Sequence, residues 1–135
     1  MKSHQRSLSQ EEIIDFAQAF DPQPYHMDAA AGDASIFGGL CASGWQVAAV
    51  ATQLASDTLA AEGYNPVMLT EVSEMKWRKP TFVDQSLTTE LQLGERQPSS
   101  MVPGCESQGV EISVFGPEAV LVAEISAVFA VDTSQ

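Results

Sequence analysis

The sequence predicts an α+β fold in which one long helix packs against an antiparallel β-sheet. Between Leu40 and Leu59, apolar and small residues recur at steps of three and four, which is the spacing of one helix face. After Gly63 the spacing changes to two, and four runs of alternating apolar residues follow. Because helices precede strands instead of alternating with them, we expect the helix to cover one face of a single sheet. With 135 residues, the chain has the size of a single domain, residues 1–135.

A first, shorter helix is predicted from about Gln10 to Phe20, with a brief strand before it. Ser9 and Glu12 have the spacing of a capping box, and apolar residues follow at helical intervals. The segment Asp21-Pro22-Gln23-Pro24 ends this helix, because prolines withhold amide donors and favour extended conformations in the residues before them. We therefore expect a fixed, non-helical turn over this segment.

The long helix is predicted to begin at Gly38-Gly39, after another helical turn in the alanine-rich residues 27–33, and to end near Gly63. Many residues on its apolar face are small, which allows close packing against a sheet. This face consists of Leu40, Gly44, Val47, Ala48, Ala51, Leu54, Ala55, Thr58 and Leu59.

Four strands are predicted after the long helix, at residues 67–76, 87–93, 110–114 and 120–131. The last strand is the longest and most apolar, so we place it inside the sheet. Residues 94–109 contain prolines, glycines and serines and are expected to connect two strands, and residues 115–118 are expected to form a hairpin turn.

The composition excludes several classes of function. Six lysines and arginines against eighteen aspartates and glutamates give a formal net charge of −12, which repels nucleic acid and anionic membranes. The polar first ten residues do not form a signal peptide, and no apolar run is long enough to span a membrane, so we expect a cytoplasmic protein. Cys41 and Cys105 lie in unlike contexts without a CxxC pattern, so we expect free thiols and no metal site.

Asp21 and His26 are candidates for acid-base catalysis. They flank a proline-braced turn directly after a helix, so both side chains can converge on one point. A carboxylate and an imidazole within reach of one water molecule can divide the roles of general base and general acid. The structural alternative is that Asp21 caps the turn and His26 is a buried histidine with satisfied hydrogen bonds.

The glycines at the predicted start of the long helix offer a second chemical feature. The first amides of a helix lack internal acceptors and lie at the positive end of its dipole. The N–H of Gly39 can therefore be presented to a carbonyl oxygen of a substrate as negative charge develops there. Alternatively, the glycines only permit a turn and tight packing, and Ser43 either caps the helix or binds substrate.

Two motifs, read together, resemble the MaoC-like family of (R)-specific enoyl-CoA hydratases. The first is Phe20-Asp21-Pro22-Gln23-Pro24-Tyr25-His26-Met27-Asp28, and the second is Phe37-Gly38-Gly39-Leu40-Cys41-Ala42-Ser43-Gly44-Trp45. The resemblance continues through Lys76-Trp77-Arg78-Lys79-Pro80 and Asp84. It covers residues 10–93, and the last two strands follow by pattern alone.

This resemblance implies a hot-dog fold, in which an antiparallel sheet wraps a long central helix, and a homodimer or higher homo-oligomer. It places the catalytic pair on Asp21 and His26 and the oxyanion amide on Gly39. The implied reaction is syn addition of water to a trans-2-enoyl thioester of CoA or a carrier protein, giving an (R)-3-hydroxyacyl product without metal or redox cofactor. Which of the pair is base and which is acid stays open.

Several further side chains are candidates for substrate binding. The cluster Lys76, Arg78 and Lys79 holds half of the six basic residues and can serve the phosphates of CoA, or it is simply solvated charge at a strand end. Tyr25 and Phe37 are candidates for lining the acyl pocket. Two tryptophans, Trp45 and Trp77, are expected as core or interface anchors instead.

Two other functions remain open. A hot-dog thioesterase acts on the same thioesters but needs a carboxylate on or near the long helix to activate water. Asp57 lies far along that helix, and its start offers only Cys41 and Ser43. A non-catalytic protein that binds acyl thioesters or serves in dimerisation is also compatible with the fold.

Overall fold

The computed structural model describes residues 1–134, which form one antiparallel sheet, one long α-helix, three shorter α-helices and one 3₁₀ helix. The helices are α1 (Gln10–Phe20), α2 (Pro24–Met27), α3 (Ala29–Ala34) and α4 (Gly44–Ala61). The strands are β1 (Arg6–Ser7), β2 (Pro66–Trp77), β3 (Ser86–Gln97), β4 (Cys105–Phe115) and β5 (Leu121–Asp132), and a short 3₁₀ helix, η1 (Pro117–Ala119), precedes β5. This order of elements confirms the predicted α+β class.

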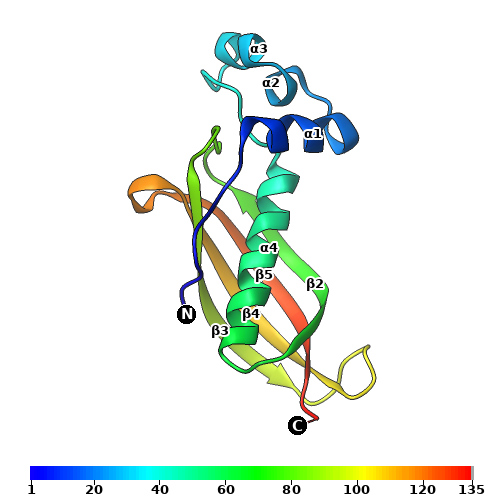
Figure 1. Ribbon diagram of the computed structural model, residues 1–135. Coiled ribbons are helices and arrows are strands. Elements are labelled where there is room, and N and C mark those ends of the chain that lie inside the picture. Colours follow the sequence, from blue (N-terminus) through cyan, green and yellow to red (C-terminus); the bar gives the residue numbers. More distant parts are fainter. Residues whose placement is uncertain (135) are drawn as a thin grey trace.

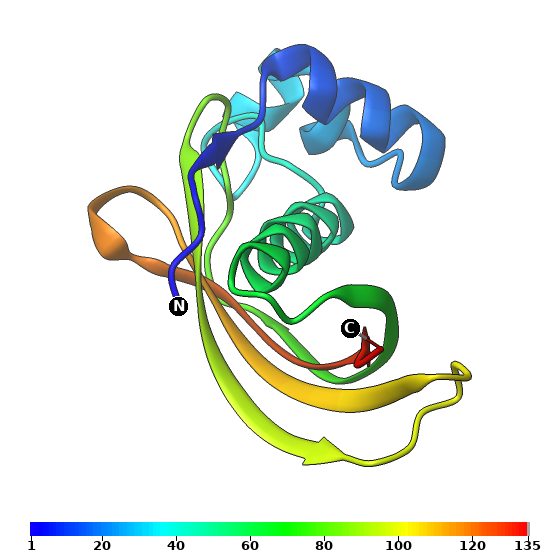
Figure 2. The ribbon, with the colours of Figure 1, turned by 60° about the horizontal axis from the view of Figure 1, so that its bottom comes forward.

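The sheet has the strand order β1-β3-β4-β5-β2, and all neighbours are antiparallel. Figure 1 shows α4 lying along the sheet with α1, α2 and α3 gathered beyond its first turn. Viewed closer to the axis of α4, the sheet curls around the helix (Figure 2). Strand β5 lies inside the sheet between β4 and β2, as predicted. Strand β2 forms one long edge, and the short strand β1 lies at the opposite edge.

The hydrophobic core lies between α4 and the concave face of the sheet. Ala51 and Ala55 are fully buried on α4, and their small side chains let the helix approach the strands closely. Leu54 and Leu59 on the same face are also fully buried, and each contributes about 1.5–3 kcal/mol of transfer free energy. The strands contribute side chains from alternate positions of one face, among them Val110, Ile112, Val114, Ile125, Ala127 and Phe129.

The capping box at the start of α1 is confirmed. The Ser9 hydroxyl accepts a 3.1 Å hydrogen bond from the Glu12 N–H, and the Glu12 carboxylate accepts a 3.1 Å bond from the Ser9 N–H. The helix then spans the residues that the sequence predicts. The sequence also predicted a non-helical turn over residues 21–24, and this prediction is wrong for Pro24. Pro24 is the first residue of α2, a position where a proline loses no helical hydrogen bond.

The long helix begins later than predicted, at Gly44 instead of Gly38-Gly39. The preceding segment is held in a non-helical conformation by backbone bonds from Cys41 N–H to the carbonyl of Tyr25 and from Ala42 N–H to that of Thr81. Ser43 caps the helix by accepting a 3.2 Å bond from Trp45 N–H.

The connection between β3 and β4 is also shorter than predicted and covers only residues 98–104. Both strands extend because Arg96 pairs with Gln108 in the ladder and donates a 3.0 Å side-chain hydrogen bond to its amide oxygen. Within residues 1–134, no helix is both long and apolar enough to cross a membrane.

Candidate active site

Asp21 and His26 lie side by side where α1 passes into α2. Asp21 caps the end of α1, with its N–H bonded to the carbonyl of Ala17 at 2.9 Å. His26 lies in the single turn of α2, and Pro22 and Gln23 connect this turn to Asp21, with the Gln23 N–H bonded to the Asp21 carbonyl at 2.7 Å. As a result, Asp21 Oδ2 lies 3.5 Å from His26 Nε2.

The hydrogen bonds of His26 define which ring nitrogen carries the proton. Nδ1 lies 2.6 Å from the carbonyl oxygen of Cys41, and because a carbonyl only accepts, Nδ1 is the donor. In the neutral ring, Nε2 is then an acceptor that faces the carboxylate of Asp21. Asp21 Oδ2 and His26 Nε2 are then two neighbouring hydrogen-bond acceptors. A molecule with two donor hydrogens, such as water, can donate to both.

Ser43 connects this pair to the start of α4. Its side chain is fully buried, and its hydroxyl donates a 2.8 Å hydrogen bond to Asp21 Oδ2 while accepting the capping bond from Trp45 N–H. The sequence left helix capping and substrate binding open for this residue. The bonds in the structure are to the helix and to Asp21, so Ser43 orients the carboxylate.

A cavity of about 290 Å³ opens beside His26. Its walls come from α2, the segment before α4, the first turn of α4 and the end of β2. The lining residues are Tyr25, His26, Phe37, Cys41, Ala42, Gly44, Val47 and residues 77–81. The ring of Tyr25 packs against both His26 and Phe37, with centroids 4.6 and 5.0 Å away. Asp21 and Ser43 do not line this cavity but lie next to it, where Asp21 approaches Nε2 of the lining residue His26.

The helix-start amide at this cavity belongs to Gly44. It is the first residue of α4 and lines the cavity, and its N–H has no hydrogen-bond acceptor within residues 1–134. Gly39 precedes the helix, does not line the cavity and packs against the ring of Phe82. Serine is strongly preferred as the capping residue directly before a helix. Taking Ser43 as this cap in the sequence would have placed the first helical residue, and its free amide, at Gly44.

The predicted cluster of basic residues divides into members with different surroundings. Lys76 bonds to Glu74 at 2.7 Å outside the cavity, and this hydrogen bond lowers the pKa of the glutamate. Arg78 lines the cavity but forms a 2.7 Å ion pair with Glu124. Lys79 also lines the cavity, and no carboxylate of residues 1–134 lies within ion-pair distance of it. Lys79 is therefore the cation most available to an anionic ligand.

Cys41 provides the carbonyl that orients His26, and the residue is one of those that line the cavity. The sulfur lies 3.8 Å from His26 Nδ1, and burial raises the pKa of the thiol. Both cysteines are free thiols, as the sequence predicts. The raised pKa disfavours the thiolate, so Cys41 is a poor nucleophile.

Trp77 is a cavity residue that the sequence reasoning missed. The sequence predicted a core or interface anchor. Trp77 is 42% exposed, so it is not a core residue, and its indole N–H donates a 2.7 Å bond to the carbonyl of Gly44. Trp45 packs edge-on against it, with ring centroids 5.2 Å apart. Sequence spacing does not reveal this position, because it depends on how the end of β2 approaches α4.

Comparison with known proteins identifies the family. The family model described as MaoC like domain matches residues 1–113. The chain belongs to the MaoC-like family. It is 31% identical over 100 residues to the uncharacterized protein YdeM of Bacillus subtilis, covering 72% of this chain and 68% of that protein.

Two solved structures establish the fold of this MaoC-like chain. The MaoC-like dehydratase from Rhodospirillum rubrum is 28% identical, with a TM-score of 0.77 over 97% of this chain and 88% of that one. The (R)-hydratase from A. caviae that is involved in PHA biosynthesis is 18% identical, with a TM-score of 0.70 over 96% and 92%. The hot-dog fold implied by the sequence is confirmed.

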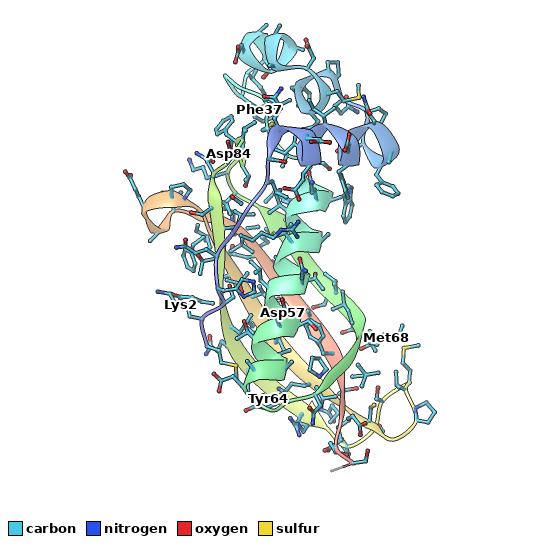
Figure 3. All side chains as sticks on the ribbon, in the orientation of Figure 1. Lys2, Phe37, Asp57, Tyr64, Met68 and Asp84 are labelled. Carbon is cyan, nitrogen blue, oxygen red and sulfur yellow. The ribbon has the colours of Figure 1, made fainter. Side chains whose placement is uncertain are left out.

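The carboxylate considered for a thioesterase lies far from the MaoC-like site. Asp57 is thirteen residues after Gly44 on α4, which corresponds to about 20 Å along the helix axis. Figure 3 shows Asp57 well down α4, whereas Phe37, which lines the cavity, lies near the other helices. Asp57 therefore cannot act on a carbonyl bound beside Gly44.

Proposed function

We propose that this MaoC-like protein is a hydratase/dehydratase that adds water reversibly to trans-2-enoyl-CoA and forms (R)-3-hydroxyacyl-CoA. The observation that carries this proposal is the pair of acceptor atoms, Asp21 Oδ2 and His26 Nε2, 3.5 Å apart beside a cavity. A water molecule donating to both atoms has its oxygen lone pairs directed away from them. That orientation suits attack on an electrophilic carbon in the cavity.

The proposed reaction uses the hydrogen bonds of His26 and Asp21. Because Nδ1 of His26 donates to the Cys41 carbonyl, Nε2 is free to take a proton from the bound water as its oxygen bonds to C3 of the enoyl group. The protonated imidazole then delivers this proton to C2 on the same face, which accounts for syn addition. Asp21, oriented by Ser43, holds the second O–H of the water, which becomes the product hydroxyl.

The negative charge that develops on the thioester oxygen requires a donor, and we assign this role to Gly44 instead of Gly39. The Gly44 N–H lies at the positive end of an eighteen-residue helix and at the cavity wall. A preorganised amide of this kind stabilises an enolate oxygen in the transition state more than the neutral carbonyl.

The cavity walls also suit the remaining parts of the substrate. Tyr25, Phe37 and Val47 offer apolar contacts to an acyl group, and Lys79 and Arg78 offer positive charge to the phosphates of CoA or of a carrier protein. Adding water to a double bond involves no net oxidation or reduction, so the proposed reaction uses no redox cofactor, and we propose that Asp21 and His26 activate the water without a metal ion. We propose a cytoplasmic location, where soluble acyl thioesters are found.

We propose that two copies pair along the β2 edge. Within residues 1–134, the outer side of β2 pairs with no strand, and a twelve-residue free edge favours association. Val67, Met68 and Val72 on this strand are exposed large hydrophobic side chains. Light scattering should give a mass of at least twice 14.4 kDa, and a monomer at micromolar concentration would contradict this assembly.

The proposed reaction is tested by incubating the purified protein with crotonyl-CoA. Hydration removes the absorbance of the conjugated thioester without releasing a thiol, and chiral analysis should find the (R)-3-hydroxybutyryl product. Release of free CoA without hydration would indicate a thioesterase. Neither change with short or long enoyl chains would indicate a binding protein.

A further inference from the structure

The wall of the proposed catalytic cavity contains a buried hydroxyl group without a hydrogen-bond partner. Thr81 lines the cavity four residues after the end of β2, and only 2% of its surface is exposed. Its Oγ1 is buried and bonds to no group in the part of the chain that the structure describes. Such a hydroxyl has lost its hydrogen bonds to water without gaining others, which destabilises the folded state. A bound substrate that accepts a hydrogen bond would remove this cost.

The backbone places Thr81 beside the segment that leads into α4. The carbonyl of Thr81 accepts a 2.8 Å hydrogen bond from the N–H of Ala42, and the neighbouring residues Cys41 and Phe82 form an antiparallel bridge. Thr81 therefore lies opposite Ala42, and both residues line the cavity. Ala42 lies two residues before Gly44, whose N–H we assign to the thioester oxygen. The unpartnered hydroxyl thus belongs to the same end of the cavity wall as this amide.

Other donors at the cavity wall are engaged or serve other parts of the substrate. The indole N–H of Trp77 donates to the carbonyl of Gly44. Arg78 and Lys79 carry full positive charges, which suit the phosphates of CoA. A carbonyl oxygen has two lone pairs, and the Gly44 N–H occupies one of them. The hydroxyl of Thr81 supplies a donor for the second lone pair.

We propose that the Thr81 hydroxyl donates a hydrogen bond to the thioester oxygen, together with the Gly44 N–H. This inference rests on the proposed hydratase function. Rotation about χ1 exchanges the hydroxyl with the γ-methyl group, which has a similar size, so the hydroxyl turns towards the bound oxygen with little change in packing. The thioester oxygen gains negative charge as water adds to the double bond. A second donor therefore stabilises the transition state more than the bound substrate and acts mainly on kcat.

Replacement of Thr81 by valine tests this role, because valine keeps the shape of the side chain and removes the hydroxyl. Since the hydroxyl has no partner in the free protein, the midpoint of urea unfolding should stay the same or rise. The kcat for crotonyl-CoA hydration should fall by about tenfold or more, with a smaller change in KM. Thr81→Ser keeps the hydroxyl and should retain most of the wild-type kcat.

The matched control is Thr89→Val. Thr89 lies on β3, is fully buried and also has an Oγ1 without a partner within residues 1–134, but it does not line the cavity. Its replacement should likewise leave the midpoint of urea unfolding unchanged or raised, and should leave kcat and KM at their wild-type values. An equal loss of kcat in both variants would overturn the role of Thr81, because the loss of any buried hydroxyl would then have the same effect.

The remaining outcomes separate this inference from the proposed function. Wild-type kcat in Thr81→Val, or a rise in KM alone, would overturn the contact with the thioester oxygen and leave the proposed reaction intact. A Thr81→Val protein that does not fold, or that unfolds at a lower urea concentration, would show that the hydroxyl has a partner in the free protein, which also overturns the inference. Absence of hydration by the wild type would overturn the proposed reaction and, with it, this role of Thr81.

Discussion

The hydroxyl of Ser43 donates a 2.8 Å hydrogen bond to Oδ2 of Asp21 and thereby joins the start of α4 to the end of α1. The same hydroxyl caps α4 by accepting from Trp45 N–H. One buried side chain therefore contributes both to the stability of the long helix and to the position of the proposed catalytic carboxylate. The next residue along the chain is Gly44, whose amide we assign to the thioester oxygen.

Replacement of Ser43 by alanine should affect both stability and catalysis. Loss of the cap should lower the free energy of unfolding by about 1 kcal/mol. Loss of a hydrogen bond to a charged group should lower kcat for crotonyl-CoA hydration by about tenfold or more. Urea unfolding and initial rates measure the two effects, and Ser43→Thr, which keeps the hydroxyl, should recover most of both. A normal kcat in Ser43→Ala would show that this bond does not position Asp21 for catalysis.

The two lysines near the end of β2 should differ in their effect on substrate binding. Lys79→Ala should raise KM for crotonyl-CoA by about fivefold with little change in kcat, because an exposed cation contributes up to about 1 kcal/mol. Lys76→Ala is the control and should behave as the wild type, since Lys76 is paired with Glu74 outside the cavity. Added salt should reduce the difference between the variants. Equal KM values for the two variants would remove Lys79 from the CoA site.

The capping box of α1 should make stability depend on pH. The backbone N–H of Ser9 lowers the pKa of Glu12 below its ordinary value of 4.5, with Arg6 adding to the effect. A carboxyl group with a lowered pKa stabilises the fold above that ordinary value, and this contribution is lost as the pH falls through the folded-state pKa. Glu12→Gln should therefore cost about 0.5 kcal/mol at neutral pH and progressively less as the pH falls below 4.5, measured by urea unfolding at a neutral and an acidic pH.

Glu11→Gln provides the matched control for this pH effect. Glu11 lies in the same first turn of α1 but is not a partner in the capping box. Its replacement should have a smaller effect at neutral pH than replacement of Glu12. A Glu12→Gln variant whose loss of stability is the same at both pH values would argue against the carboxylate as the stabilising form.

The two cysteines should differ in reactivity. Burial raises the pKa of the Cys41 thiol, and the thiolate is the reactive form, so iodoacetamide should label Cys105 first near neutral pH. Peptide mass spectrometry over a time course separates the two rates. Because Cys41 lines the cavity, crotonyl-CoA should slow its labelling further and leave that of Cys105 unchanged. Labelling of Cys41 at the rate of Cys105 would contradict the raised pKa.

Local sequence patterns predicted most of the fold because they report local physics. The alternation of side chains located the four main strands, and the spacing of Ser9 and Glu12 located the start of α1. The five-residue interval between Asp21 and His26 was enough to bring their side chains together, since both helix boundaries near them depend on neighbouring prolines.

The features that sequence patterns did not predict depend on contacts between distant segments. The start of α4 at Gly44 follows from backbone bonds of Cys41 and Ala42 to Tyr25 and Thr81, which no local signal reveals. The divided basic cluster depends on which carboxylates lie opposite each lysine and arginine. The position of Trp77 over Gly44 was not predicted either, because it depends on the contact between the end of β2 and α4.

The rate of crotonyl-CoA hydration in Asp21→Asn and His26→Gln tests the central claim most directly, with Asp15→Asn as the control. Asp15 is an exposed aspartate on α1, so its replacement should leave the rate unchanged. If Asp21 and His26 hold and activate the water, each replacement should lower kcat/KM at least about a hundredfold while the protein remains folded. Hydration by Asp21→Asn at the wild-type rate would contradict the assignment of this pair.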